Sequence, residues 1–159
     1  MSDASLIVDL QDLGVAHQHG YDSGLVGVNL TLAPGQLVAV QPEANQRESP
    51  LADVVMGVLM HDTGKALYRG AAWGDMHPAT AAAARAQIGR VFAGPAWVSN
   101  LDIDENILVK LRHHRLMNMS AAVSDMQQLA QRFGLEDVLA QRPAWVARGV
   151  LKRAQWVRA

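Results

Sequence analysis

One stretch of the sequence, residues 38–64, constrains the fold more than any other. It opens on a short apolar run, Leu37 to Val40, that follows Gly35 and precedes a polar loop. Such a run is typical of a buried parallel strand. After the loop, apolar residues recur at steps of three and four, as on an amphipathic helix: Leu51, Val54, Val55, Val58 and Leu59. Strand, polar loop and helix in this order indicate a phosphate-binding loop.

Composition narrows the class of protein. Half of the 159 residues are hydrophobic and 18% are charged, which predicts one domain with a real core rather than a disordered chain. Fourteen basic and fifteen acidic residues give a formal charge of −1, so no global field favours nucleic acid or an anionic membrane as the main partner. The absence of cysteine excludes disulfides, thiolate zinc sites and a cysteine nucleophile.

The pattern of apolar residues predicts where the chain acts. No apolar run approaches the roughly 18 residues of a membrane span. The first residues, Met-Ser-Asp-Ala, lack the basic and apolar regions of a signal peptide. We therefore expect a cytoplasmic protein.

Local patterns predict the remaining elements. Antiparallel strands are expected at residues 6–13 and 28–32, an edge strand at 66–69, a helix at 78–86 and a second buried strand at 88–92. A helix carrying Ile103, Ile107, Leu108 and Leu111 is expected to be capped by Asp102 or Asp104. Another is expected to start at Ser120, bury Val123, Met126, Leu129, Ala130 and Phe133, and end at Gly134.

The sequence resembles the ATP-binding subunits of ABC transporters. Residues 38–40 and 51–64 match the flanks of their Walker A motif, and 88–92 (IGRVF) matches their "I-G-x-V-F-Q". Residues 100–107 (NLDIDENI) match "x-L-T-V-x-E-N-[IV]". The resemblance implies an α/β, partial P-loop NTPase fold in a single incomplete domain. Its parts would be an N-terminal antiparallel β-subdomain (1–35), a P-loop core (36–95) and a C-terminal helical subdomain (96–159).

The phosphate-binding loop departs from the family's G-x-x-x-x-G-K-[ST]. Its four defining places hold Pro42, Arg47, Glu48 and Ser49, and Asn45 stands on a further family glycine. Proline has a locked φ and no N–H, and a side chain at residue 47 disfavours the left-handed geometry that wraps phosphate. Asn45 tolerates that geometry. Ser49 retains the hydroxyl that the family uses on magnesium.

Glu48 replaces the lysine that reaches the phosphates. A unit-charge pair at about 4 Å is worth roughly 4 kcal/mol at an effective dielectric near 20. Reversing one charge makes this a repulsion, against a total of about 8 kcal/mol for micromolar binding. Ser49-Pro50 also reads as an N-cap with proline at the first helical position, so the helix should begin near residue 50, displaced from the phosphate.

Two further nucleotide motifs of the family are also altered. The Q-loop glutamine is Ala93, which has no side-chain donor or acceptor. Val146, Ala147, Arg148 and Gly149 stand where the signature L-S-G-G is expected, and the arginine alone could still attract phosphate. The arginine-rich sequence of residues 149–159 is most similar to the Mla-type lipid-transport ATPases.

Histidines and one tyrosine near the N-terminus are weaker candidates. The resemblance places His19 or Tyr21 near the aromatic residue that stacks on adenine, although an exposed loop residue is the favoured interpretation because the phosphate site is altered. His17 and His19 would share a face of a strand, but no further ligands accompany them, so no metal site is expected.

These observations predict a subunit like an ABC ATP-binding subunit that neither binds nor hydrolyses ATP and needs no cofactor. It would act as a structural or regulatory partner of a transmembrane permease or of a second ABC subunit. The alternative is a working, possibly lipid-transporting ATPase subunit using ATP and Mg²⁺, completed by another chain or by a missing C-terminal half. A bare interaction module is the third reading. The resemblance covers about the first two-thirds of a family domain, so truncation is also expected.

Overall fold

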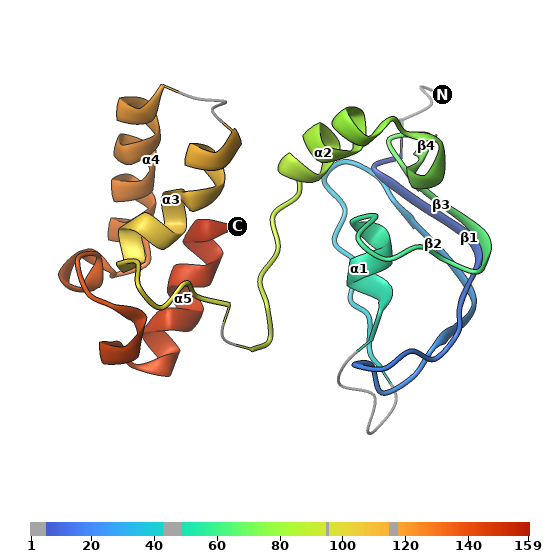
Figure 1. The fold of residues 1–159 in the computed structure, drawn as a ribbon, viewed down its shortest axis with the longest axis horizontal. Helices are drawn as coiled ribbons and strands as arrows, with labels where there is room; N and C mark the ends of the chain where they lie inside the picture. Colours follow the sequence, from blue (N-terminus) through green and yellow to red (C-terminus); the bar gives the residue numbers. More distant parts are fainter. Residues whose placement is uncertain (1–5, 43–48, 95, 115–117) are drawn as a thin grey trace. The chain divides into compact units, whose positions relative to one another are not determined.

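The computed structural model describes residues 6–42, 49–94, 96–114 and 118–159, and divides the chain into two compact units, Met1–Arg85 and Ala86–Ala159. The first unit holds a four-stranded antiparallel sheet with three helices, and the second holds three α-helices with two short 3-10 turns (Figure 1). The first unit contains β1 (Val8–Val15), β2 (Leu25–Leu32), α1 (Leu51–Val55), β3 (Thr63–Tyr68), β4 (Ala71–Ala72), η1 (Trp73–Asp75) and α2 (Pro78–Ala86). The second contains α3 (Ile103–His114), α4 (Met119–Arg132), η2 (Glu136–Val138), η3 (Pro143–Trp145) and α5 (Arg148–Arg158).

The sheet of the first unit has the strand order β2-β1-β3-β4. Along β1, the residues facing the core are Val8, Leu10, Leu13 and Val15. The strict alternation of inward and outward residues is broken between Leu10 and Leu13. The register shifts there, and Asp12 takes a φ of 44°. This β-bulge inserts one residue, so that Leu13 rather than Asp12 faces inward. Burial of a leucine of this kind contributes about 1.5–3 kcal/mol.

The antiparallel strands and α2 confirm the sequence predictions, with one correction. Residues 66–69 were expected to form an edge strand, but β3 pairs with β1 on one side and β4 on the other. The hairpin that creates this second neighbour turns at Arg69 and Gly70, with φ values of 50° and 82°. Two successive residues at positive φ are typical of a type I′ turn.

Two predicted strands are wrong. Residues 36–40 and 88–92 form no strand in the described chain, and Leu37 and Val40 are 95% and 57% exposed. A parallel strand is stable only with a hydrogen-bonded neighbour and cover on both faces. Every strand pair in the described sheet is antiparallel, so neither segment has such a neighbour. Apolar sequence alone therefore did not make a strand here.

Helix α1 is shorter than its apolar stripe predicts. It begins one residue after Pro50, as expected, but ends at Val55 rather than near Leu59. Gly57 then adopts a φ of 63° and lies against the ring of Trp73, where an added Cβ would be 2.3 Å from a ring atom. The indole of Trp73 donates to the carbonyl of Val55 at 3.1 Å. This contact fixes the end of α1 on the core of the first unit.

The second unit is a small helical bundle with its own core, built by one face from each of α3, α4 and α5 (Figure 1). The buried residues are Ile103, Ile107, Leu108, Ala122, Met126, Ala130, Leu135, Ala154 and Val157. This confirms the predicted helical subdomain and most of the predicted stripes. Helix α4 begins earlier than expected, because the side chain of Asn118, not Ser120, accepts its first free N–H. Gly134, with a φ of 62°, ends it as predicted.

Candidate functional site

The phosphate-binding loop is described only at its ends. Asn45, Arg47 and Glu48 lie outside the described residues, whereas Pro42 and Ser49 lie within them. The hydroxyl of Ser49 accepts the N–H of Leu51 at 3.3 Å, so it acts at the start of α1. Helix α1 has only five residues. Because the helix dipole sums over aligned peptides, so short a helix offers little positive potential to a phosphate.

Tyr21 contacts α1, and the two histidines precede it in the loop after β1. The hydroxyl of Tyr21 donates to Asp53 of α1 at 3.1 Å, and a ring nitrogen of His17 lies 2.9 Å from the carbonyl oxygen of Tyr21. His19 is exposed. Among the described residues, no three metal-ligating side chains gather in one place. Tyr21 therefore ties the loop after β1 to α1 in this structure.

The Q-loop and signature positions meet in one place. A cavity of about 500 Å³ in the second unit is lined by Ala93 and Gly94 on one side and by Arg148 and Gly149 on the other. Trp97, Leu151, Lys152 and Gln155 complete its wall. Val146 instead packs against the helical core. The carbonyl of Ala147 accepts the N–H groups of Val150 and Leu151. Two of the four signature positions thus line the cavity and two do not.

Helix α5 holds the segment 93–97 by side-chain hydrogen bonds. Lys152 Nζ donates to the carbonyl of Ala93 at 3.1 Å, and Gln155 Nε2 donates to the carbonyl of Gly94 at 3.2 Å. Arg158 donates to the carbonyl of Ala96 and lies over the ring of Trp97, 4.8 Å from its centroid. Burial lowers the pKa of Arg158 below its usual value. Three backbone carbonyls, those of Ala93, Gly94 and Ala96, are therefore bonded to side chains of α5.

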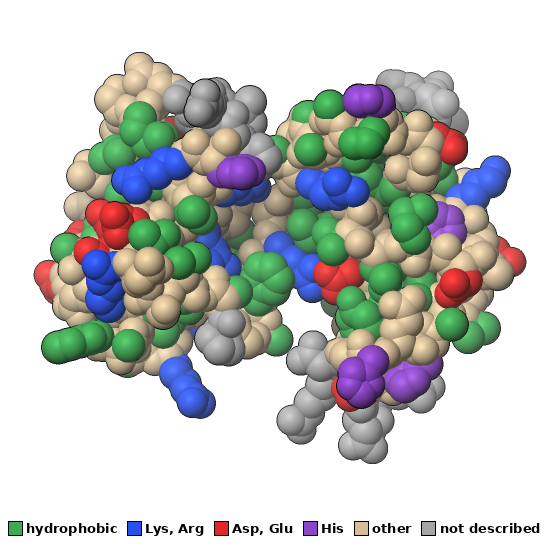
Figure 2. Space-filling view, in the orientation of Figure 1, with side chains coloured by type: hydrophobic (Ala, Val, Ile, Leu, Met, Phe, Trp, Pro, Cys, Tyr) green, Lys and Arg blue, Asp and Glu red, His purple; other side chains and the backbone are tan. Residues whose placement is uncertain are grey.

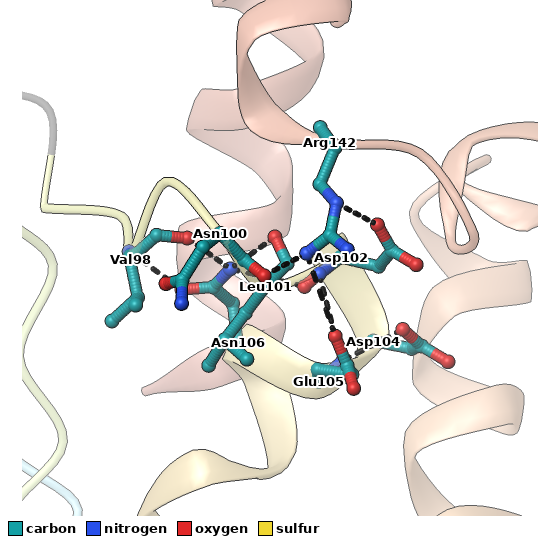
Figure 3. A network of polar contacts seen from close by, with 8 residues as sticks. All are labelled: Val98, Asn100, Leu101, Asp102, Asp104, Glu105, Asn106 and Arg142. Carbon is teal, nitrogen blue, oxygen red and sulfur yellow. Dashed lines mark hydrogen bonds and ion pairs between the residues drawn. The ribbon is translucent and has the colours of Figure 1, made fainter.

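The motif at residues 100–107 is structural. Asn106 is fully buried, and its Nδ2 group donates to the carbonyls of Val98, Leu101 and Asp102 at 3.0–3.1 Å (Figure 3). Its Oδ1 accepts the N–H of Val98 at 2.8 Å. One side chain thus satisfies most of the backbone that leads into α3. An asparagine suits this place because it combines two donors with an acceptor.

Arg142, which lies between η2 and η3 in the sequence, also binds this motif. Its Nε lies 3.0 Å from an oxygen of Asp102, and the guanidinium also reaches Glu105 and the carbonyl of Asn100 (Figure 3). Glu105 accepts the N–H of Asp102 at 2.8 Å, the backward half of a capping box. Of the two predicted caps, Asp102 directly precedes α3, and its carboxylate pairs with Arg142, while the carboxylate of Asp104 accepts the N–H of Glu105 at 2.7 Å.

Comparison with known proteins identifies the fold. A dimeric structure of MJ0796, described as a bacterial ABC transporter cassette, superposes with a TM-score of 0.81 at 17% identity, over 95% of this chain and 68% of that one. The structure of cbiO1 from Clostridium perfringens, part of the ABC transporter complex cbiONQ, gives 0.73 at 17% identity, over 97% and 61%. The fold is that of the ATP-binding subunits of ABC transporters.

A curated protein whose name describes it as an ATP-binding protein is also similar in sequence. The sulfate/thiosulfate import ATP-binding protein CysA of Synechococcus elongatus is 29% identical over 155 residues. That match takes in 96% of this chain but only 42% of the relative, so the chain spans less than half of that protein's length. No family model matches the sequence. The α/β fold class predicted from the sequence is thereby confirmed.

Some residues of the ABC-like fold escaped the sequence analysis. Gln155 was read only as part of an arginine-rich helix, yet it is 3% exposed and its Oε1 has no partner in the described chain. The available signal was its place between Ala154 and Val157, on the inward side of α5.

No helix in the described ranges is long and apolar enough to cross a bilayer.

Proposed function

We propose that the chain is a relative of ABC ATP-binding subunits that no longer binds or hydrolyses ATP and serves a transporter as a structural or regulatory partner. The observation that carries this proposal is the retention of the fold together with the loss of nucleotide-contacting side chains at three separate motifs. Pro42 and Glu48 occupy the phosphate loop, Ala93 occupies the Q-loop position, and Ala147 removes the signature hydroxyl.

The cavity geometry supports the same proposal. In place of a serine hydroxyl, the start of α5 presents Ala147, whose side chain has no hydrogen-bond donor, and Arg148 stands in place of a family glycine. An arginine at this place supplies charge but not the set of short donors that encloses a phosphate. The hydroxyl of Ser49 is likewise engaged at the start of α1.

The proposed partner is a membrane permease, contacted from the cytoplasmic side. Support comes from the fold and from the name of the relative that is similar in sequence, which describes that protein as an import ATP-binding protein. For the cargo, the arginine-rich α5 favours a lipid, and the name of the relative favours sulfate or thiosulfate. Capture of a permease with the tagged chain from its native cells, followed by identification of the bound cargo, separates these two substrate classes.

The decisive experiment is a titration of the purified chain with Mg²⁺ and labelled ATP. We expect no saturable binding at micromolar nucleotide, and no gain on changing Ser49→Ala. Glu48→Gln removes the carboxylate while preserving the size of the side chain. We expect this change to improve the binding free energy for ATP by less than the roughly 4 kcal/mol that a restored pair of opposite charges would contribute. Saturable micromolar binding that Glu48→Gln leaves unchanged would overturn the proposal.

A second candidate function is a working ATPase subunit whose remaining catalytic groups come from further polypeptide. The retained Ser49 and the ATP-binding name of the sequence relative favour it. The test is phosphate release by this chain with its permease present. Steady turnover that is lost on Ser49→Ala supports this candidate, and its absence with a well-folded complex supports the first.

A further inference from the structure

The two edges of the sheet in the first unit differ in how they are protected. At one edge, β4 has only two residues, which leaves a second chain almost nothing to pair with. At the other edge, β2 has eight residues and pairs with β1 alone among the described strands. A bulge at Val26 and Gly27, where the register shifts and Gly27 takes a φ of 61°, leaves residues 28–32 as the regular part of this edge.

The open edge carries no charge. Residues 23–42 include no Asp, Glu, Lys, Arg or His. Natural edge strands commonly carry a lysine or another charge that prevents them from pairing with a second chain. In this sheet the charged side chains lie on the inner strands instead, with Asp9 and Asp12 on β1 and Lys65 on β3. The usual distribution of charge over a sheet is therefore reversed.

The inward face of β2 is incompletely covered. Val28, Leu30 and Leu32 alternate along the strand and are half-buried, whereas their cross-strand partners on β1 are at most 6% exposed. Side chains directly opposite each other on two strands share one face of the sheet, so these three residues belong to the core face. A further strand beside β2, with apolar residues at the same spacing, would extend that face and cover more of it.

We propose that residues 28–32 pair antiparallel with the same residues of a second copy of this chain, so that two four-stranded sheets join across a two-fold axis. An antiparallel strand edge presents the same donors and acceptors to a copy turned about such an axis, and is therefore self-complementary. The half-buried apolar residues of the two copies then lie side by side on one face. On the other face, Asn29 and Thr31 are exposed and uncharged.

A second copy fits this edge better than a partner of another kind. An acidic or basic partner would find no opposite charge on residues 23–42, whereas a copy meets no like charge there. The formal charge of −1 also adds little repulsion between two whole molecules. Pairing over residues 28–32 is small beside the roughly 20–30 residues a side of a stable interface, so the dimer is weak and forms at raised concentration. This inference goes beyond the proposed function and involves neither nucleotide nor permease.

The test is sedimentation velocity of the full chain over a range of concentrations, with charges added at Thr31 of β2. Thr31→Lys and Thr31→Glu each bring like charges together near the two-fold axis, so each variant alone should dimerise about tenfold more weakly or less. An equal mixture of the two should dimerise again, because unlike charges now face each other. High salt should weaken the mixed dimer but not the unmodified one.

Matched variants separate this edge from the rest of the surface. Ala71→Lys and Ala71→Glu place the same charges on an exposed residue of β4, the opposite edge strand, and should leave the dimer unchanged. Hydrogen exchange on the unmodified chain gives a local measurement. The amides of residues 28–32 that point away from β1 should exchange more slowly as the concentration rises. Melts by circular dichroism verify that each variant folds.

Three outcomes would overturn the proposal. The first is a monomer at every concentration that the chain tolerates in solution. The second is a dimer that Thr31→Lys and Thr31→Glu leave unchanged, which would place the contact elsewhere. The third is an equal loss from the Ala71 variants, which would indicate a general effect of charge. If the Thr31 variants do not fold, exchange at residues 28–32 that does not depend on concentration refutes the pairing on its own.

Discussion

Replacing Asn106 by alanine should unfold the helical unit far more readily than its small change in volume suggests. The substitution removes four hydrogen bonds to Val98, Leu101 and Asp102. The carbonyls of Val98 and Asp102 keep the backbone N–H groups of Leu101 and Asn106 as partners, but the N–H of Val98 and the carbonyl of Leu101 lose the partner that Asn106 supplies. At about 1–3 kcal/mol for each group left buried without a partner, these two groups cost about 2–6 kcal/mol.

This loss is a large part of the total stability of a domain, about 5–15 kcal/mol. For a unit of this size, 2 kcal/mol corresponds to a fall in Tm of at least about 8 °C. Thermal melts followed by circular dichroism measure it. The matched control is Asn100→Ala, because Asn100 is exposed and contributes only its backbone carbonyl to the network. Equal melting temperatures for the two variants would refute the reasoning.

Asn106→Asp tests the electrostatic side of the same network. A carboxylate there would face three carbonyl oxygens, so its pKa in the folded state should rise above the unfolded value of about 3.9. A raised folded pKa stabilises the protein below the unfolded pKa and loses that contribution as pH rises through the folded one. We therefore expect this variant to be most stable in acid, which a series of melts from acidic to neutral pH would reveal.

Three further predictions concern single contacts. Gly57→Ala should destabilise the first unit by more than Gly70→Ala in urea melts: both glycines have positive φ, but an added Cβ at Gly57 meets Trp73 at 2.3 Å, and at Gly70 it meets nothing within 4 Å. Asn118→Ala should cost about 1 kcal/mol by loss of the α4 cap, and unchanged stability would contradict the assigned cap. Burial lowers the pKa of Lys110 in the folded state below 10.5. Between the folded and the unfolded pKa, the unfolded state binds more protons, so stability should rise with pH in that range. Lys110→Met should abolish this rise in thermal melts at alkaline pH.

Elements that depend on neighbouring residues could be predicted from the sequence. The antiparallel strands follow from alternation and turn residues, and α2 follows from Pro78 and a run of alanines. Even here, detail depended on context. Ser120 and Asn118 are both good caps, and in the structure the side chain of Asn118 accepts the N–H of Ser120. The bulge at Asp12 leaves no clear signal either, because Asn29, seventeen residues away, binds its N–H.

Elements that depend on distant partners could not be predicted. Residues 36–40 and 88–92 carry the apolar composition of buried parallel strands, but such strands take their hydrogen bonds from segments far away in sequence. The cavity beside α5 is similar, since it depends on Gln155 reaching the carbonyl of Gly94, 61 residues away. Local sequence pattern placed Ala93 and Arg148 in separate motifs and gave no reason to expect both to line one cavity.

The extended segment at Leu37–Val40 has a practical consequence for work with the purified chain. In this segment the folded molecule exposes 95% of one leucine and about half of each of two valines. A reagent that binds apolar surface should therefore bind the folded chain as it would an unfolded one. The native chain should brighten the dye ANS, a response usually taken as a sign of a molten state. It should also attract holdase chaperones on expression, because these recognise the same features, so low yield would not by itself indicate a defective fold.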